Sequence, residues 1–204
     1  MTAWRESVEA FIRAEAMPVD KFGHQPRLYA LTTQIAASTE FDRKCDDDVL
    51  FAAAWMHDLG VFLGHRPADP VALASWDHVP YTITETRKLL TDWGFPAAKR
   101  AAVAETIRTH EAKYEAVLPE AIVLRDADIL EQLGAIGALR AFVKVGRDTR
   151  FAIFSDVIPV LERAVQVLPA KLRLPSSREL ARTRVAFLES LLGAIREEGG
   201  GRLY

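Results

Sequence analysis

Hydrophobic residues recur at helical spacing along most of the chain. Near the amino terminus, Trp4, Val8, Phe11 and Ile12 would all lie on one face of a helix. Since helices average about 11–12 residues, the pattern predicts an all-α bundle of about seven to nine helices. The stretches with this periodicity are residues 2–17, 45–58, 77–94, 95–111, 126–146, 150–168 and 176–198.

Charged and turn-forming residues mark the ends of some of these helices. The three aspartates from Asp46 to Asp48 are favourable at a helix amino terminus, where their charge complements the helix dipole. Pro80 in a first turn and Gly94 after a last turn delimit the third predicted helix. These signals agree with the hydrophobic periodicity and support the helical interpretation.

The second half of the chain holds three less regular features. Pro159 lies inside the predicted helix over 150–168 and predicts a kink there. Gly134 and Gly137 would allow two helices to cross closely. The apolar run at 121–124 is compatible with a short strand, although no second run is available to pair with it.

The composition is that of a globular protein and gives no indication of a nucleic-acid partner. Hydrophobic residues make up 50% of the 204 residues and charged residues 26%, which is ordinary for a globular chain. The net charge is −2 and the Lys and Arg residues are scattered, so we expect no nucleic-acid polymer as a partner. No window holds eighteen uncharged apolar residues, so we expect no membrane. The one cysteine, Cys45, excludes an internal disulfide and a cysteine-based zinc site. Since the amino-terminal residues lack the features of a signal peptide, we expect a cytoplasmic protein.

A histidine and an aspartate end the most apolar of the predicted helices. His57 and Asp58 directly follow the apolar run at 51–56. An unpaired carboxylate is costly to bury, so Asp58 requires a cation, a hydrogen-bond donor or water beside it. A metal ion would meet this requirement.

A second histidine is predicted to face inward at the end of another helix. His110 is spaced by three and seven residues from Ile107 and Val103, which places it on the apolar stripe. Helical bundles build metal sites from side chains of facing helices. Asp126 and Asp128 add carboxylates, and imidazole with carboxylate suits Fe, Mn, Ni, Zn or Co. The sequence therefore predicts a site for a divalent metal ion, with Mg²⁺ as a further candidate.

The order of these residues resembles the HD-domain superfamily of metal-dependent phosphohydrolases. Its signature is a histidine, then an adjacent His-Asp pair, then a distant aspartate, as in His24, His57-Asp58 and Asp128. The stretches "AAAWMHDLG" and "RDADILEQLGAIGALRAF" are similar to those of small, stand-alone bacterial members. The likeness runs from about residue 20 to about residue 197.

The resemblance implies the fold and the domain organisation. We expect a compact single-domain helical bundle of the HD-domain type over residues 1–204. Its metal-binding core would span about residues 20–145, and the helices of residues 151–197 would pack on that core. The resemblance leaves a homodimer open.

The resemblance also implies a set of metal ligands. Asp128 is preferred to Asp126, because the metal aspartate of the superfamily is usually the second of such a pair. Asp126 would then be a helix cap or a partner of a ligand. The reverse assignment stays open, since Asp128 and Glu131 also match a helix capping box. The implied ligands of one divalent ion are His24, His57, Asp58 and Asp128.

Further residues are implied at a second metal or at the substrate. His78 and His110 fall where some members carry ligands for a second metal and others line the substrate cavity. Asp58 could bridge two metals and is the expected catalytic residue. The candidates for contact with a substrate phosphate are Arg140, which is the best placed, and Arg27, Arg66, Lys113 and His65.

The implied reaction is hydrolysis of a phosphate ester by metal-activated water. We expect the substrate to be a nucleotide or another small phosphorylated metabolite. One alternative is a di-iron oxygenase of the same fold that cleaves a C–C or C–P bond. Another is a non-catalytic ligand-binding module with a degenerate site, against which the complete ligand set argues. The stretch "HDLGVF" lacks the "HDIGK" motif of the cyclic-di-GMP phosphodiesterases, which makes that substrate class a poor match.

Overall fold

The described part of the chain is all-α, as predicted. The computed structural model describes residues 2–38, 41, 43–63 and 66–204, and none of these residues forms a strand. Three short 3-10 helices join the α-helices, η1 (Ala97–Lys99), η2 (Phe154–Asp156) and η3 (Pro169–Lys171). The α-helices are α1 (Ala3–Glu15), α2 (Val19–Ala36), α3 (Asp47–Met56), α4 (Leu59–Phe62), α5 (Pro70–Ser75), α6 (Val79–Asp92), α7 (Arg100–Arg108), α8 (Pro119–Glu131), α9 (Gly134–Phe142), α10 (Ile158–Val167) and α11 (Pro175–Gly199).

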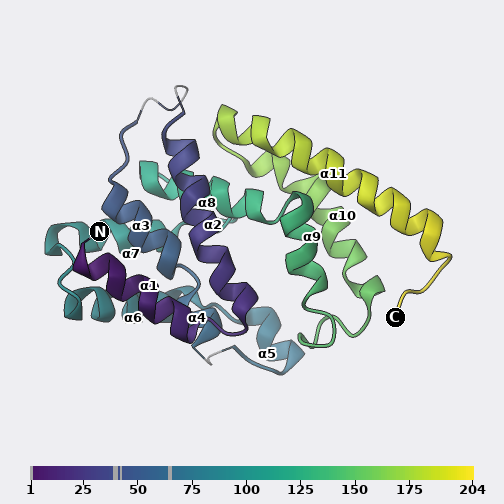
Figure 1. The fold of residues 1–204 in the computed structure, drawn as a ribbon, viewed down its shortest axis with the longest axis horizontal. Helices are drawn as coiled ribbons and strands as arrows, with labels where there is room; N and C mark the ends of the chain where they lie inside the picture. The colour runs from purple at the N-terminus through teal and green to yellow at the C-terminus, as the bar shows by residue number, and fades with distance from the viewer. Residues whose placement is uncertain (1, 39–40, 42, 64–65) are drawn as a thin grey trace.

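Two groups of helices pack together through α8 (Figure 1). In the first group, α2 packs against α3 and α8, and α3 also packs against α1 and α7. In the second group, α9 and α10 pack against the long helix α11, at the right of the view. Because α8 contacts both α2 and α11, it connects the two groups.

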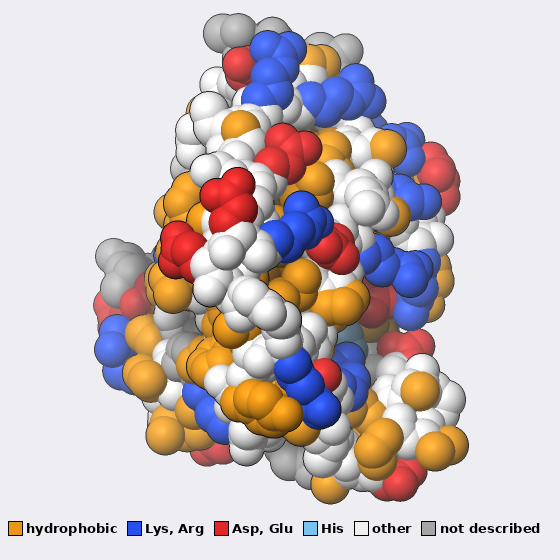
Figure 2. All heavy atoms as spheres, turned by 90° about the vertical axis from the view of Figure 1, so that its right-hand side faces the viewer, with side chains coloured by type: hydrophobic (Ala, Val, Ile, Leu, Met, Phe, Trp, Pro, Cys, Tyr) orange, Lys and Arg blue, Asp and Glu red, His pale blue; other side chains and the backbone are white. Residues whose placement is uncertain are grey.

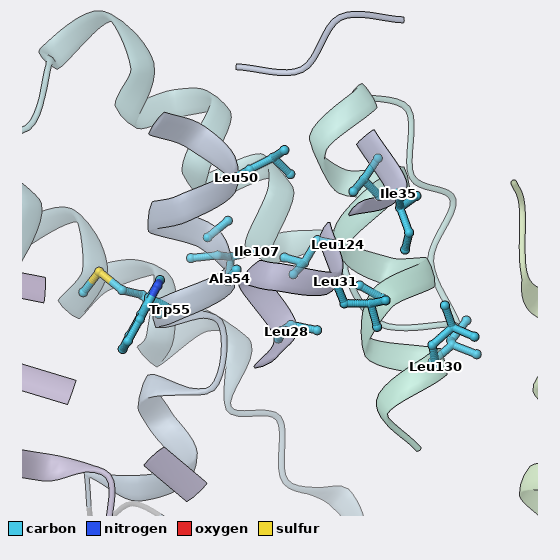
Figure 3. Close-up of a cluster of buried hydrophobic side chains, with 14 of the residues drawn as sticks. Leu28, Leu31, Ile35, Leu50, Ala54, Trp55, Ile107, Leu124 and Leu130 are labelled. Carbon is cyan, nitrogen blue, oxygen red and sulfur yellow. The ribbon is translucent and has the colours of Figure 1, made fainter. Parts of the chain in front are cut away.

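The apolar core fixes the helices that carry the candidate site. Every residue of α3 from Val49 to Met56 is buried. Figure 3 shows side chains of α2, α3, α7 and α8 meeting in one cluster, including Leu28, Ala54, Ile107 and Leu124. Replacing a buried leucine of such a core by alanine costs about 2–5 kcal/mol of unfolding free energy. The ends of these helices are therefore held firmly in place.

Two predictions for residues 121–146 are wrong. The run at 121–124 lies inside α8, and it reads as continuously apolar because α8 is buried on nearly every side. The helix predicted over 126–146 is two helices, since Leu133 has an extended backbone and Gly134 has φ +72°. A Cβ at Gly134 would lie 3.1 Å from side-chain atoms of Arg184 on α11, so the predicted close helix approach at this glycine does occur.

The prediction of a kink at Pro159 is also wrong. The helix there begins only at Ile158, so Pro159 lies in its first turn, where the missing N–H costs no hydrogen bond. The residues from Phe154 to Asp156 form η2 instead. In the described part of the chain, no helix is both long and apolar enough to cross a membrane.

Candidate metal centre

The His-Asp pair lies at the junction of α3 and α4. Asp46 caps the start of α3, because its Oδ1 accepts from the N–H groups of Asp48 at 3.0 Å and Val49 at 3.3 Å. The helix ends at Met56, and His57 retains helical dihedral angles. Asp58 leaves the helical conformation with φ −100° and ψ 14° before α4 begins. The break between the two helices is therefore what places two polar side chains at the end of an apolar helix.

Gly60 brings the start of α6 against this junction. Its N–H donates to Thr82 Oγ1 at 2.9 Å. A Cβ at position 60 would lie 2.9 Å from that oxygen and 3.0 Å from the main-chain oxygen of His78. Because a glycine allows this approach, His78 Nε2 lies 3.4 Å from Asp58 Oδ1.

Four histidine rings and two carboxylates converge at this point. The ring centroids of His24 and His57 are 5.3 Å apart, and those of His57 and His110 are 5.1 Å apart. Asp128 Oδ1 lies 3.5 Å from His24 Nε2. Ligand atoms of His24, His57 and Asp58 lie within 4.8 Å of one another. The same spacing holds for a second, overlapping group, Asp58, His78 and His110.

Hydrogen bonds from Nδ1 leave Nε2 of two rings available to a metal. His57 Nδ1 donates to the main-chain oxygen of Ala54 at 3.0 Å, and His110 Nδ1 donates to that of Ile107 at 2.6 Å. A carbonyl oxygen can only accept, so the proton must be on Nδ1 and the lone pair on Nε2. Metal-binding histidines commonly have such a carbonyl or carboxylate partner on the other nitrogen.

Two further imidazole nitrogens are buried without a hydrogen bond. Within the described part of the chain, Nε2 of His24 and Nε2 of His78 have no hydrogen-bond partner. Each nevertheless faces a carboxylate oxygen, on Asp128 and Asp58 respectively. Buried polar atoms are normally satisfied, so this pair of unpartnered nitrogens fits a divalent cation between imidazole and carboxylate.

Glu131 belongs to this site and was not predicted as a site residue. It is buried, and its Oε2 lies 3.2 Å from His24 Nδ1. The same oxygen accepts from Arg27 Nη2 at 3.2 Å and lies 3.7 Å from Arg140 Nη1. The spacing from Asp128 matched a capping box, but that interpretation is wrong because both residues lie in the second half of α8. The sequence feature that could have indicated Glu131 is its spacing of three residues from Asp128, which puts both carboxylates on one helix face.

The two aspartates of the D-x-D pair have different partners. Asp126 is fully buried, and its carboxylate accepts from the main-chain N–H groups of Arg173 at 3.0 Å and Leu174 at 2.9 Å. It therefore anchors the segment before α11 rather than capping its own helix. Asp128 is the one that faces His24, and it also accepts from Gln132 Nε2 at 3.2 Å. This geometry supports Asp128 over Asp126 as a ligand.

The electrostatics of the cluster suit a cation. Burial lowers the pKa of His57 to about 4, so its ring is neutral at neutral pH. Burial opposes ionisation of Asp58, but the neighbouring histidines His57, His78 and His24 together outweigh it and hold the Asp58 pKa well below its ordinary value. Burial also opposes ionisation of Asp128, but His24, His57 and Arg140 together outweigh it and lower the pKa of Asp128. Burial opposes protonation of His24, yet the carboxylates of Asp128 and Glu131 raise its pKa.

A cationic cleft of about 380 Å³ opens beside the cluster. Its lining includes His24 and Asp58 from the candidate metal centre. Asp58 and Asp148 are the acidic residues among the described lining. Figure 2 shows Lys and Arg side chains gathered around a hollow in one face of the molecule. The cations of this lining are Lys21, Arg66, Arg140, Lys144, Arg147 and Arg150.

The structure places only some of the predicted substrate contacts in the cleft. Arg140 and Arg66 line the cleft. Arg27 is not among the described lining, and it donates to Glu131 instead. Lys113 forms an ion pair with Glu111 at 2.6 Å and is also not in the described lining. His65 lies outside the described residues.

A second cavity of about 360 Å³ adjoins the cationic cleft. Asp58, Arg140 and Lys144 line both spaces. Asp128 and Glu131 also line the second cavity. Its remaining wall is largely apolar and comes from α9 and α10, through Gly137, Ala141, Val160, Leu161, Ala164, Val167 and Leu168.

Comparisons with known proteins agree with this geometry. The HD domain family model matches residues 22–133, which is more than half of the chain. YpgQ from Bacillus subtilis is 19% identical with a TM-score of 0.71, and the alignment covers 97% of this chain and 96% of YpgQ. The structure of that protein in complex with ADP gives 19% identity, a TM-score of 0.69 and coverages of 96% and 94%.

A further structure with this fold comes from an uncultured Thermotogales bacterium. It is described as a predicted HD superfamily hydrolase, is 20% identical and gives a TM-score of 0.61. The alignment covers 96% of this chain and 92% of that protein. A search of curated protein sequences found no match. At these identities the structural likeness establishes the fold.

Proposed function

The chain belongs to the HD domain family, and on that premise we propose that it is a metal-dependent phosphohydrolase. The observation that carries the proposal is the position of the histidine and aspartate cluster beside a cleft lined by six Lys and Arg residues. A cluster of this composition fits a divalent metal, and the cations fit the phosphate of a substrate. We place nucleotides and other small phosphorylated metabolites first, and the similarly folded YpgQ has been crystallised with ADP.

The ligands that we propose for one divalent ion are His24, His57, Asp58 and Asp128. Asp58 belongs to both overlapping groups of ligand atoms, so it is placed to bridge a second ion held with His78 and His110. Fe, Mn, Ni, Zn and Co suit such a mixed imidazole and carboxylate set, and Mg²⁺ remains a candidate. When bound, a divalent ion would polarise a phosphoryl oxygen and lower the pKa of the attacking water.

The residues of the cleft would bind and orient the phosphate ester. Arg140 is fixed by its contacts with the main-chain oxygen of Glu131 at 3.3 Å and with the carboxylate of that residue. Its guanidinium has further N–H donors, and it lines both cavities next to Asp58. We propose that Arg140 holds a phosphoryl oxygen near the metal centre while Asp58 serves as the catalytic carboxylate.

The di-iron oxygenase alternative would use the same order of ligands. The cationic lining favours the hydrolase, because six Lys and Arg residues suit a phosphate group better than a neutral substrate. A phosphonate would also carry negative charge, so this alternative is tested directly by oxygen uptake with phosphonates and polyols. A degenerate site is disfavoured because all six predicted side chains converge.

A screen of phosphorylated metabolites with several divalent ions tests the proposal. We expect phosphate release that depends on the metal. His57→Ala and Asp128→Ala should each lower turnover by at least about a hundredfold, which is the usual effect of removing a group that takes part in the catalytic step. Metal content of the purified proteins should fall in the same two variants. Glu105→Gln removes an exposed carboxylate paired with Arg108 and should change neither result. Folded variants that keep full turnover and full metal content would refute the proposed site.

A further inference from the structure

Asp148 holds two arginines of the cationic cleft on one carboxylate. Arg150 donates from Nε to Oδ1 at 3.1 Å and from Nη2 to Oδ2 at 2.8 Å, which is a bidentate pairing. Arg66 Nη2 donates to the same Oδ2. The Asp148 side chain is only 3% exposed, so the carboxylate is enclosed by its partners. Burial opposes its ionisation, but Arg150 and Arg66 outweigh that effect and lower the pKa of Asp148.

Both arginines keep N–H donors that Asp148 does not use. A guanidinium has five N–H donors. Arg150 gives two of its nitrogens to the carboxylate and Arg66 gives one. The Arg150 side chain is 49% exposed and the Arg66 side chain is 25% exposed, so each has an open side. Among the described residues no other side-chain hydrogen bond of Arg66 or Arg150 occurs, so the remaining donors can bind an anion that enters the cleft.

The same aspartate connects two chain segments across the cleft. Arg66 follows α4, whereas Asp148 and Arg150 follow α9. Thr149 Oγ1 also donates to the main-chain oxygen of Ala68 at 3.2 Å, which adds a second link between these segments. The turn itself is closed by the Phe151 N–H, which donates to the main-chain oxygen of Asp148 at 2.9 Å. The two guanidinium groups are therefore held on a common and well-supported anchor.

This assembly lies in the same cleft as the proposed metal centre. Arg66, Asp148 and Arg150 share the lining with His24 and Asp58. A substrate that reaches the metal centre from this cleft would pass or contact both guanidinium groups. Two like-charged side chains repel each other, so a shared carboxylate is what keeps them together in the absence of substrate.

We propose, building on the phosphohydrolase proposal, that Asp148 is a positioning residue that holds Arg66 and Arg150 as one anion-binding pair for the substrate. The pair is ready before the substrate arrives, so little side-chain entropy is lost on binding. Asp148 itself contacts the two arginines rather than the reacting phosphate. Its loss should therefore weaken binding of an anion and leave the chemical step nearly unchanged.

A purely neutralising role for Asp148 predicts the opposite effect. If the carboxylate only offset the charge of the two arginines, its removal would make the cleft more positive and anion binding tighter. If it only fastened the two segments together, its removal would lower stability without a specific change in anion affinity. Anion affinity measured on the folded variant separates these roles.

The test is the affinity of inorganic phosphate for the full-length protein, measured by calorimetry with and without divalent metal. We expect Asp148→Asn to raise the Kd of phosphate about tenfold, equivalent to about 1.4 kcal/mol. Arg150→Lys keeps the charge and loses the bidentate geometry, so it should raise the Kd by about threefold even if Asp148→Asn folds poorly. In an Arg66→Gln, Arg150→Gln background, Asp148→Asn should have little further effect, because the residue acts through those side chains.

Asp48→Asn is the matched control. Asp48 also joins two cations, Arg5 and Lys99, each at 2.8 Å, but at the amino-terminal end of α3 and not in the cleft. This control should leave phosphate affinity unchanged. With a substrate from the screen, Asp148→Asn should raise KM and keep kcat. Unchanged or tighter phosphate binding in folded Asp148→Asn would overturn the proposal, and it would do so whether or not hydrolysis is found.

Discussion

The main-chain partners of His57 and His110 determine what these side chains can bind. Each ring donates from Nδ1 to a carbonyl one helical turn earlier, on Ala54 and Ile107. The carbonyl oxygen requires a proton on the nitrogen that faces the helix, and Nε2 is left available to a metal ion. A neutral imidazole is also less costly to bury than a charged one, which agrees with the lowered pKa of His57.

His57→Asn tests the protonation state of this ring in the metal-free protein. The His57 pKa is about 4 when folded and 6.5 as its ordinary value, so between these pH values the unfolded chain binds a proton that the folded chain does not. The free energy of unfolding should therefore rise with pH across this window and fall as the pH drops. Relative to His57→Asn, the original protein should lose about 3 kcal/mol between pH 6.5 and 4. Urea unfolding at a series of pH values measures the difference, and parallel curves would contradict it.

At the residue scale, motif order predicted more than composition could. Three separate helices or helix ends contribute His24, His57, Asp58 and Asp128. The resemblance predicted from the sequence that these side chains lie together. Glu131 could not be recognised in the same way, because its role depends on the contact with His24 across two helices. The sequence around Glu131 does not reveal such a contact between distant residues.

At the element scale, the site depends on where helices stop. Periodicity predicted helices at α1, α3, α6, α7, α9, α10 and α11, because burial of one face repeats along each of them. It gave no prediction for α2, α4 or α5. It did not predict the break at Gly134, where the apolar pattern continues although the backbone reverses its φ angle. It also placed the start of α10 too early, since the residues before Ile158 are partly buried without forming an α-helix.

Gly60→Ala tests the contact between α4 and the start of α6. The added Cβ would lie 2.9 Å from Thr82 Oγ1 and 3.0 Å from the main-chain oxygen of His78, so one of the two helices must shift. We expect a loss of about 1–3 kcal/mol in unfolding free energy, as for overpacked cores. Metal affinity should fall as well, because His78 would move away from Asp58.

Gly193→Ala in α11 is the control for this substitution. A Cβ there would have nothing within 4 Å, so the change removes only the flexibility of a helical glycine. It should stabilise the protein by about 0.5–1 kcal/mol. Denaturant unfolding of both variants and metal titration of Gly60→Ala supply the comparison. Equal stability of the two alanine variants would show that the close approach at Gly60 is unimportant.

At the scale of the whole molecule, the charge of the cleft lining is opposite in sign to the net charge of the chain. The chain has a net charge of −2, yet the cleft collects six Lys and Arg residues from positions between 21 and 150. These cations are scattered along the sequence, so their convergence could not be predicted from it. It arises because residues of α2, of the segment after α4, and of α9 with the turn after it line the same cleft. The absence of a basic tract bears only on nucleic-acid polymers, and it could not reveal a local cluster of cations in the folded chain.

The folded chain also makes the candidate metal centre and the cleft parts of one site. Asp58 is a proposed ligand of the metal and lines both cavities. The apolar wall from α9 and α10 extends the second cavity away from the charged cleft. The proposed phosphate ester substrate would therefore have a charged region and an apolar region available next to the same carboxylate.

The most direct test is X-ray diffraction from crystals grown with Mn²⁺ or Zn²⁺, with data collected at the absorption edge of the metal. We expect an anomalous peak from a metal ion that lies about 2.0–2.3 Å from Nε2 of His24, Nε2 of His57 and the carboxylates of Asp58 and Asp128. A second peak next to His78 and His110 would show that two ions bind. A metal-saturated crystal with no peak among these residues, or with the Asp128 carboxylate turned away from His24, would rule out the proposed metal centre.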